Sequence, residues 1–292
     1  MKLLVTGGSS FVGAWFCHLA SRDHEVVAVY NRTPVRVPGA ESLHCDLGAT
    51  GAVEQLREVG ADAVVHLACK VKGTGDGRRQ TEASRLNRAM MDAVLGLELP
   101  CVYASSTCVH WPRESGYKRC RVTDELRLRD SGVPFAILRP CAPYGPRLSW
   151  HQPSHKESFH TLSELVERSP LVPVIGDGRY RRQPVHVDDF NGSILRLLEK
   201  GLPGAAFDSG GAEALTFDEL VRVIARAAGK RRRPLHIPKP AIIAASRFSP
   251  DFEPELLDTA DTDDVADPRP LAEATGLWPR SFRAGVDCLL RR

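Results

Sequence analysis

The chain has 292 residues with ordinary shares of hydrophobic (42%) and charged (26%) residues, so it can bury a substantial core as one large domain or two closely joined ones. A formal net charge of +3 is too small and too scattered to indicate nucleic acid as the main partner, and we interpret the basic run at residues 230–233 as a solvated loop. No apolar stretch reaches the roughly 18 residues of a membrane span, and the chain starts directly in a strand, so we expect a cytoplasmic protein without membrane contact.

The first strong motif is TGGSSFVG at residues 6–13, between a short apolar strand-like run and a helical stretch at 11–20. Glycines allow the tight turn and the close packing of helix on strand, and the free amides of the helix N-terminus suit a pyrophosphate. Serine replaces the usual middle glycine, and because its side chain occupies space near the phosphate, we expect a shifted pose. The motif predicts NAD or NADP at Gly7, Ser9, Ser10, Phe11, Val12 and Gly13.

Strand-like runs alternate with helical stretches along the first half of the chain. The runs lie at 3–5, 25–30, 63–67, 101–104 and 134–138, and the helices at 11–20, 52–59, 82–97 and 117–131. Such alternation predicts a parallel sheet covered on both faces, that is, an α/β fold with a Rossmann-type, doubly wound sheet. Eight cysteines without a CxxC pair, several at strand ends, indicate buried reduced thiols rather than disulfides or zinc ligands.

The second half is less regular and predicts a smaller C-terminal substrate lobe over the carboxyl edge of the sheet. Helices are expected near 162–168 and 217–228, and the acidic, proline-containing stretch 258–270 is expected to be a surface connection before apolar periodicity returns at 271–290. We therefore predict a dinucleotide-binding domain at 1–145, joined again by 183–205, and a substrate lobe from 146–182 and 206–292.

The end of the second strand bears on the choice of cofactor. An acidic residue there would bind the adenosine ribose and repel a 2′-phosphate, but the sequence reads Tyr30, Asn31, Arg32. A guanidinium can contact phosphate bidentately, so Asn31 and Arg32 favour NADP over NAD. The alternative is that Arg32 is simply a solvated loop arginine.

The order of motifs along nearly the whole chain resembles the extended short-chain dehydrogenase/reductase family, the NAD(P)-dependent epimerase/dehydratase group. The motifs are TGGSSFVG at 6–13, CDL at 45–47, HLA at 66–68, Asn87, YASS at 103–106, Tyr117 with a basic residue four positions later, LRP at 138–140, YGP at 144–146, GDG at 176–178 and VHVDD at 185–189.

This resemblance implies a Rossmann sheet with a C-terminal substrate lobe and reversible hydride exchange between a sugar-like carbon and a nicotinamide. It also implies a homodimer formed through the helices that carry Asn87 and Tyr117. Further cofactor contacts are implied at Asp46, Leu47, Leu67, Ala68, Asn87 and Pro140, and substrate contacts at Arg182, Tyr144 and Thr107.

Tyr117 is the candidate acid/base. Hydride transfer to a carbonyl needs a proton for the developing alkoxide, and a tyrosine supplies it near neutral pH only if a cation lowers its pKa from about 10. Arg121, four residues on and on the same helical face, provides that charge, although the family's usual choice is lysine and an arginine need not reproduce its contact with the nicotinamide ribose. A hydroxyl at Ser106, or at its neighbour Ser105, is the candidate second hydrogen-bond partner of the reacting oxygen; a helix cap or turn is the alternative.

Several departures concern the substrate. Only ten residues separate Ser106 from Tyr117, which is short for the family and predicts a more open pocket. An asparagine that commonly touches a nucleotide diphosphate is replaced by Ala142, whereas Arg182 stands where the family often places an arginine on the substrate phosphates. Thr107 and Cys108 stand where dehydratases carry an Asp-Glu pair, which argues against dehydration.

The histidines at 151, 155 and 160 do not predict a metal site, because Pro153 interrupts the helix that would align them and no carboxylate is placed as in HExxH. We expect His186 and Asp188 to be structural. Three functions remain open: an NADP-preferring oxidoreductase or epimerase of a nucleotide sugar, a ketoreductase of a non-nucleotide secondary metabolite, and a non-catalytic NAD(P)-binding sensor or scaffold.

Overall fold

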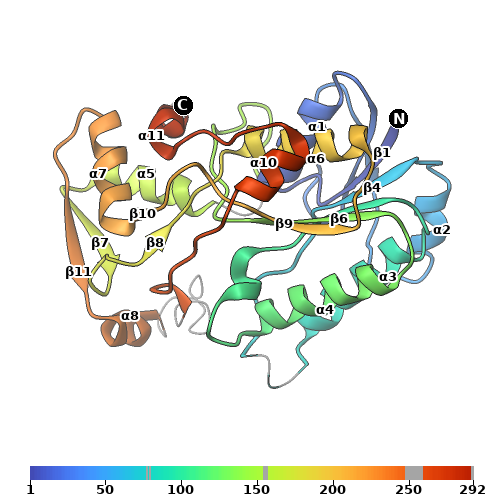
Figure 1. Ribbon diagram of the computed structural model, residues 1–292. Coiled ribbons are helices and arrows are strands. Elements are labelled where there is room, and N and C mark those ends of the chain that lie inside the picture. Colours follow the sequence, from blue (N-terminus) through green and yellow to red (C-terminus); the bar gives the residue numbers. More distant parts are fainter. Residues whose placement is uncertain (77, 79, 154–156, 247–258, 291–292) are drawn as a thin grey trace.

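The computed structural model describes all residues except 77, 79, 154–156, 247–258 and 291–292 (Figure 1). Its strands are β1 (Lys2–Thr6), β2 (Glu25–Tyr30), β3 (Glu41–His44), β4 (Ala63–His66), β5 (Cys101–Ala104), β6 (Phe135–Pro140), β7 (Leu171–Ile175), β8 (Arg181–Arg182), β9 (Ala205–Ser209), β10 (Leu215–Thr216) and β11 (Arg233–Ile237). Its α-helices are α1 (Phe11–Ala20), α2 (Ala52–Arg57), α3 (Glu82–Leu95), α4 (Gly116–Asp130), α5 (Ser158–Arg168), α6 (Val187–Lys200), α7 (Phe217–Ala227), α8 (Lys239–Ser246), α10 (Arg269–Thr275) and α11 (Phe282–Gly285), with 3₁₀-helices η1 (Thr107–His110) and η2 (Val286–Leu289).

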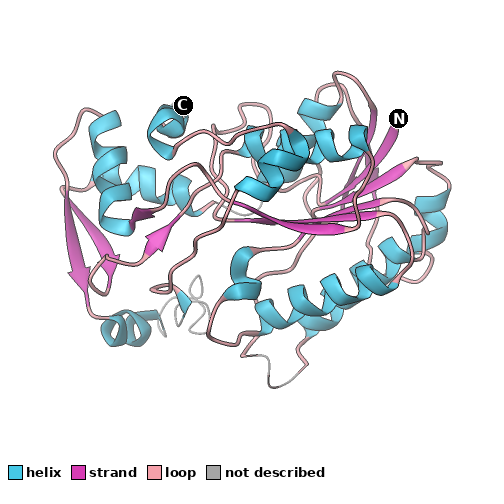
Figure 2. Cartoon of the chain, in the orientation of Figure 1, coloured by secondary structure: helices cyan, strands magenta, loops and turns pink. Residues whose placement is uncertain are grey.

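A seven-stranded parallel sheet in the order β3-β2-β1-β4-β5-β6-β9 forms the centre of the first unit (Figures 1 and 2). Helices α1, α6 and α10 cover one face, and α2, α3 and α4 cover the other. Because both faces are covered, the central strands are almost continuously apolar; β4, for example, is buried at every position. The predicted α/β class with a doubly wound Rossmann-type sheet is confirmed.

A second, smaller unit lies beside one end of the sheet, to the left in Figure 1. Helices α5 and α7 pack together over the parallel pair β7 and β11, with α11 and η2 completing an apolar core of their own. Phe159, Leu220 and Phe282 are buried in this core. The chain enters the unit after the carboxyl ends of β6 and β9.

The boundary between the two units differs from the prediction at two places. We expected the return to the first unit to end at residue 205, yet β9 (Ala205–Ser209) is the edge strand of the main sheet and pairs with β6. Helix α10 also packs on α6 and β9, with Leu271 buried in the core of the first unit. The signal was weak because β9 carries a polar Asp208 and an edge strand needs no continuous apolar run.

Two segments expected to be solvated loops are tied to the fold. Lys230 and Arg232 donate to the carbonyls of Glu167 and Val166, each at 2.6 Å, at the end of α5. The stretch 259–267, expected as a surface connection, is bonded to β8 and its flanks: Arg181 pairs with Asp263 at 2.8 Å. Basic side chains satisfy the free carbonyls of a helix C-terminus, which explains the first contact.

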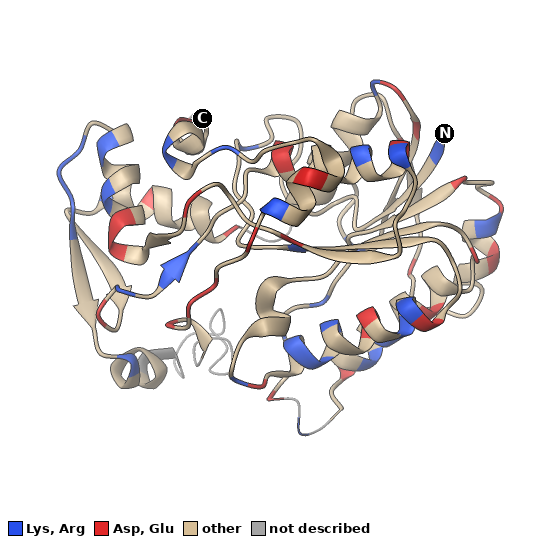
Figure 3. Ribbon diagram, in the orientation of Figure 1, with Lys and Arg blue, Asp and Glu red and all other residues tan. Residues whose placement is uncertain are grey.

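Charge is spread over the molecule, with basic and acidic residues interspersed along α3 and α4 (Figure 3). All eight cysteines are free thiols, and five of them are buried, including Cys45 and Cys101. Among the described residues, no helix combines the length and the apolar character that a membrane crossing requires.

Candidate active site

The glycine-rich turn joins β1 to α1. Gly7 has φ +73°, and a Cβ at this position would come within 2.7 Å of the backbone nitrogen of Ala68, so only glycine fits between the two loops. Ser10 caps the helix: its Oγ accepts a hydrogen bond from the N–H of Gly13 at 3.0 Å. The hydroxyl of Ser10 is thus used inside the turn.

Other residues of the turn serve it through packing and backbone contacts. Phe11 is buried edge-on against the ring of His160, 5.0 Å between centroids. Asn191 donates to the carbonyl of Val12 at 3.4 Å. The Nε2–H of His151 donates to the carbonyl of Ser9 at 2.9 Å, so this histidine supports the turn from the loop between β6 and α5. From the sequence alone, His151 is considered only as a candidate metal ligand.

The turn also fits a dinucleotide. Gly7 lets the turn run against the backbone of the loop after β4, and the turn leads directly into the N-terminus of the ten-residue helix α1, whose free amides suit a pyrophosphate. Asn31 and Arg32 are exposed directly after β2. Asp46, also exposed, accepts from the N–H of Gly48 at 3.0 Å.

Two predicted cofactor contacts have structural partners. Leu47 is packed in the core on one face of the sheet, with 7% of its surface exposed. The side-chain amide of Asn87 bonds to the backbone of Lys70, accepting from its N–H and donating to its carbonyl, both at 2.8 Å. Asn87 thereby holds the loop after β4. Leu67 and Ala68 are half-buried in that loop.

Ser105 and Ser106 follow β5 and have different partners. Ser105 is buried and donates to Oε1 of Glu125 at 2.6 Å, which accounts for it structurally. Ser106 is extended, with φ −163°, and its Oγ accepts from the N–H of Cys108 at 3.2 Å as the cap of η1. Because the Ser106 hydroxyl only accepts in this bond and is half-buried, its proton is free to be donated. Ser106 is therefore a better candidate than Ser105 for a hydrogen bond to the reacting oxygen.

Thr107, predicted to touch substrate, is buried and donates to the carbonyl of Pro140 at 3.3 Å, where it links η1 to the end of β6.

The short segment from Ser106 to Tyr117 is compact. It forms η1, turns, and enters α4 with Ser115 as the cap. Gly116 allows this path, because a Cβ there would overlap the carbonyl oxygen of Thr74 in the loop after β4.

Tyr117 and Arg121 are one turn apart on α4 and in contact. The guanidinium carbon of Arg121 lies 5.1 Å from the centre of the Tyr117 ring. Burial raises the pKa of Tyr117 to about 12, and Arg121 opposes that rise. The pairing expected from the spacing is therefore present. The expected fall of the Tyr117 pKa below about 10 is not, because burial outweighs the charge of Arg121. The guanidinium is also held by β5, where Nη1 donates to the hydroxyl of Tyr103 at 2.8 Å and to the carbonyl of Ala104 at 3.0 Å.

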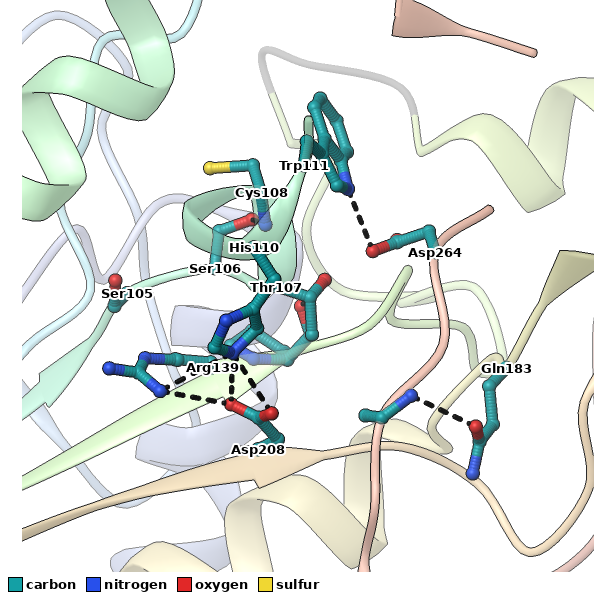
Figure 4. A network of polar contacts seen from close by, with 12 residues as sticks. Ser105, Ser106, Thr107, Cys108, His110, Trp111, Arg139, Gln183, Asp208 and Asp264 are labelled. Carbon is teal, nitrogen blue, oxygen red and sulfur yellow. Dashed lines mark hydrogen bonds and ion pairs between the residues drawn. The ribbon is translucent and has the colours of Figure 1, made fainter. Parts of the chain in front are cut away.

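A second set of charged residues lies beside Ser105 (Figure 4). Arg139 binds Glu125 through two bonds, Nε to Oε1 at 2.8 Å and Nη2 to Oε2 at 2.6 Å, and reaches Asp208 on β9 at 3.2 Å. His110, the last residue of η1, lies 3.0 Å from the same Asp208 carboxylate. This outer network, Ser105, Glu125, Arg139, Asp208 and His110, anchors both sides of the turn that carries Ser106.

Residues of the second unit also differ from the sequence prediction. Tyr144 is fully buried between Phe159 and Phe282, and its hydroxyl has no hydrogen-bond partner among the described residues, so it presents no surface to a substrate. Arg182 stacks on Tyr180 and donates to main-chain carbonyls of residues 260 and 262, the former at 2.5 Å. Three of its five N–H groups are thereby engaged, counting the bond to the carbonyl of residue 181.

The segment 259–267 also reaches the residues that follow β5. Asp264 accepts from Nε1 of Trp111 at 3.0 Å (Figure 4). It also accepts from the thiol of Cys141 at 3.3 Å. Gln183 adds a further tie, accepting from the N–H of Ala266 at 3.0 Å. The stretch 259–267 thus joins the two units directly beside η1.

A family model described as the NAD dependent epimerase/dehydratase family matches residues 3–210. The chain belongs to this family. Its extended short-chain dehydrogenase/reductase character, expected from the motif order, is confirmed, and the protein is an enzyme of that type.

Relatives of this epimerase/dehydratase chain differ in their activities. A ceramide reductase of Caulobacter vibrioides is 25% identical over 251 residues, covering 82% of this chain and 75% of that protein. An uncharacterized UDP-glucose epimerase of Bacillus subtilis is 26% identical over 269 residues, covering 79% and 83%. The UDP-glucose 4-epimerase of Thermotoga maritima, solved with UDP-glucose, superposes with a TM-score of 0.78 at 20% identity, covering 99% and 97% of the two chains.

Sequence reasoning missed most partners of the epimerase/dehydratase motifs. Glu125, Asp208 and Asp264 belong to no motif, and each meets its partner across a long stretch of chain; Asp208, for example, is 98 residues from His110. The only feature of the sequence that could have indicated these partners is the presence of polar residues at strand ends and on the inner face of α4. His186 and Asp188 are structural as expected, with the His186 ring accepting from the N–H of Asp188 at 3.2 Å to cap α6.

The histidines do not form a metal site among the described residues, where no group of three or more His, Cys, Asp and Glu side chains could hold an ion. His160 donates to the carbonyl of Gly145 at 2.9 Å, and His151 supports the glycine-rich turn. His155 lies outside the described residues.

Proposed function

We propose that the chain catalyses hydride transfer at a hydroxyl/carbonyl carbon of a nucleotide sugar, as an NAD(P)-dependent oxidoreductase or epimerase. The observation that carries this proposal is the contact of Tyr117 with Arg121 at the carboxyl edge of a sheet whose first turn fits a dinucleotide. A tyrosine backed by a permanent cation is suited to pass a proton to and from an oxygen that becomes an alkoxide.

The cofactor, when bound, supplies or accepts the hydride. The turn from Gly7 to Gly13 would hold its pyrophosphate at the start of α1, with Asn31, Arg32 and Asp46 toward the adenosine. The exposed guanidinium of Arg32, with no carboxylate beside it, supports a preference for NADP.

The protein's own residues control the proton. Burial keeps Tyr117 protonated across the neutral range, so its hydroxyl is a donor in the direction of reduction. In the direction of oxidation the charge of Arg121 favours the tyrosinate, which then accepts the proton of the substrate hydroxyl. Ser106 would hold the reacting oxygen, and Ser105, bonded to Glu125, fixes the backbone at this point.

A second candidate substrate is a ketone without a nucleotide. Two observations favour it: Ala142 has no group that could bind a diphosphate, and three N–H groups of Arg182 already bind carbonyls of the chain. The reductases among the relatives are compatible with this alternative. A non-catalytic sensor is the third possibility, motivated by Arg121 in place of lysine.

We also propose that the enzyme is a cytoplasmic homodimer that pairs through α3 and α4. These helices pack side by side, and α4 exposes Val122 and Leu126, the latter with 55% of its surface accessible. Apolar side chains of this size at the centre of a helical face suit burial against a second copy.

A calorimetric titration of the cofactor-stripped protein with NADPH and then NADH, repeated with UDP, TDP and GDP, tests the proposal. Tighter NADPH binding that one nucleoside diphosphate strengthens is the expected result. Binding of dinucleotide without any response to the nucleoside diphosphates would favour the ketone. Binding without exchange of hydride label to any candidate substrate would favour the sensor, and no binding would reject all three.

A further inference from the structure

Arg121 is a cation buried between two tyrosine rings. Only 6% of its surface is exposed, and its guanidinium carbon lies 5.1 Å from the Tyr117 ring and 5.5 Å from the Tyr103 ring. Its Nε–H has no acceptor among the described residues. A charge removed from water in this way acts strongly on its neighbours, because little solvent screens it.

Tyr103 fixes the position of that charge. Its hydroxyl accepts from Nη1 of Arg121 at 2.8 Å and donates to Oδ2 of Asp124 at 3.3 Å. Its ring stacks on His66 from β4, 5.5 Å between centroids and 18° between planes. The ring of Tyr103 is therefore held by His66, and its hydroxyl links the guanidinium of Arg121 to the carboxylate of Asp124. We call Tyr103, Arg121 and Asp124 the inner network.

Asp124 shares the charge of Arg121. It is 5% exposed, and burial raises its pKa to about 6 while Arg121 opposes that rise. At neutral pH it is therefore largely a carboxylate. Because a buried cation can favour either of two nearby anions, Asp124 and a tyrosinate at Tyr117 compete for the same guanidinium.

The titratable groups that face Arg121 from β4, the loop after it and η1 are neutral near pH 7. From β4, His66 has its pKa lowered to about 3 by burial and by Arg121. Burial raises the pKa of Cys69, in the loop after β4, to about 11 and that of Cys108, on η1, to about 12. Burial also raises the pKa of Cys120 on α4 and, far above its usual value, that of Tyr103.

Two charged groups lie on the outer side of Asp124. Arg127 on α4 lowers the pKa of Asp124 and Asp92 on α3 raises it, and these two side chains form an ion pair with each other. Asp124 is thus the charged competitor for Arg121 within the inner network.

We propose that Tyr103 and Asp124 are positioning residues that set how strongly Arg121 acts on Tyr117: Tyr103 holds the guanidinium against the Tyr117 ring, and Asp124 draws part of its charge away. The inference rests on the proposed acid/base role of Tyr117. It assigns a function to two residues that touch neither cofactor nor substrate. The two residues have opposite effects on the same phenol, which a purely structural role would not produce.

The test places 3,5-difluorotyrosine at position 117 alone and follows its ¹⁹F signal against pH in the cofactor-free protein. Fluorination lowers the pKa of the phenol, so the titration falls in a range that the fold tolerates. Tyr103→Phe keeps the ring on His66 but removes one of the two acceptors that hold Nη1 of Arg121, the other being the carbonyl of Ala104. We expect the pKa at 117 to rise by about one unit. Asp124→Asn removes the competitor, and we expect that pKa to fall by roughly half a unit.

Glu125→Gln is the matched control. Glu125 is the next residue on α4, is equally buried at 5% exposure, and bonds to Arg139 and Ser105 instead of Arg121. It should leave the titration at 117 within about 0.2 unit, because its charge is already paired. Circular dichroism confirms folding of each variant. If Tyr103→Phe does not fold, the contrast between Asp124→Asn and Glu125→Gln still decides the inference, because only a competitor for Arg121 lowers the pKa at 117 when its charge is removed.

Equal shifts in Asp124→Asn and Glu125→Gln, or shifts of the same sign in Tyr103→Phe and Asp124→Asn, would overturn the inference. In the active enzyme, the pH profile of kcat in the oxidation direction should move with the ¹⁹F titration. The proposed acid/base role of Tyr117 is contradicted by a different result, namely retention of turnover in Tyr117→Phe. The titration needs no substrate, so the two failures are distinguishable.

Discussion

The inner and outer networks lie side by side on α4, but their charges are paired to different degrees. In the outer network, Arg139 stands between the carboxylates of Glu125 and Asp208, so each charge has a partner. In the inner network, Arg121 has one carboxylate, Asp124, which it meets only through the hydroxyl of Tyr103. Paired charges fix a backbone, whereas a partly compensated cation influences the group beside it. Burial alone does not distinguish the two, because residues 124 and 125 are equally buried.

The largest expected effect comes from the group on which the inner network acts. Tyr117→Phe keeps the ring on Arg121 and removes the proton, so turnover should fall by about 10²–10⁴-fold. Affinity for the dinucleotide should change by less than about twofold, since the turn at Gly7 is untouched. Steady-state rates and calorimetry on the same samples measure both. An equal loss of cofactor affinity would indicate a structural role instead.

In the outer network, the main effect should be on stability. Arg139→Met leaves Glu125 buried without its cation, and we expect the free energy of unfolding to fall by about 3 kcal/mol. Urea unfolding followed by circular dichroism measures it. Arg196→Met is the control, because its ion pair with Glu199 is exposed and should contribute less than about 1 kcal/mol. Similar losses in both variants would contradict a special role of the outer network.

The inner network should also make stability depend on pH. The pKa of Asp124 is about 6 in the folded protein and near 3.8 when unfolded, so the folded state binds more protons between these values. Its contribution is therefore greatest at low pH and is lost as pH rises through about 6, on the order of 3 kcal/mol. The unfolding free energy of the wild type relative to that of Asp124→Asn should therefore fall as pH rises from 4 to 7. A constant difference between them would exclude this linkage.

A change outside both networks should have the smallest effect. Ala142 has φ +40°, a conformation that costs an L-residue energy and glycine nothing. Ala142→Gly should therefore stabilise by less than about 1 kcal/mol. Ala274→Gly, inside α10, should destabilise by about 1 kcal/mol, because glycine weakens a helix interior. Thermal unfolding should show a higher melting temperature for Ala142→Gly and a lower one for Ala274→Gly. Changes of the same sign would mean that the strain at residue 142 is relieved elsewhere.

The sequence by itself determined the first unit of this protein. Alternating apolar runs and helical stretches specify a covered parallel sheet, and the helix at 11–20 has the predicted bounds because its cap, Ser10, is local. The pairing of Tyr117 with Arg121 was predictable for the same reason, since residues four apart share a helical face. The motif order was enough to indicate the family, which the family model confirms.

Only the tertiary structure decided what surrounds those motifs. It placed β9 at the edge of the main sheet, Tyr144 in a core, and Arg182 on carbonyls of a segment some 80 residues away. It also decided that Asp124 faces Arg121 while Glu125 faces Arg139. Periodicity and spacing specify contacts within a turn or a strand, but a buried charge is assigned its partner by packing between distant segments, and that packing has no local signature in the sequence.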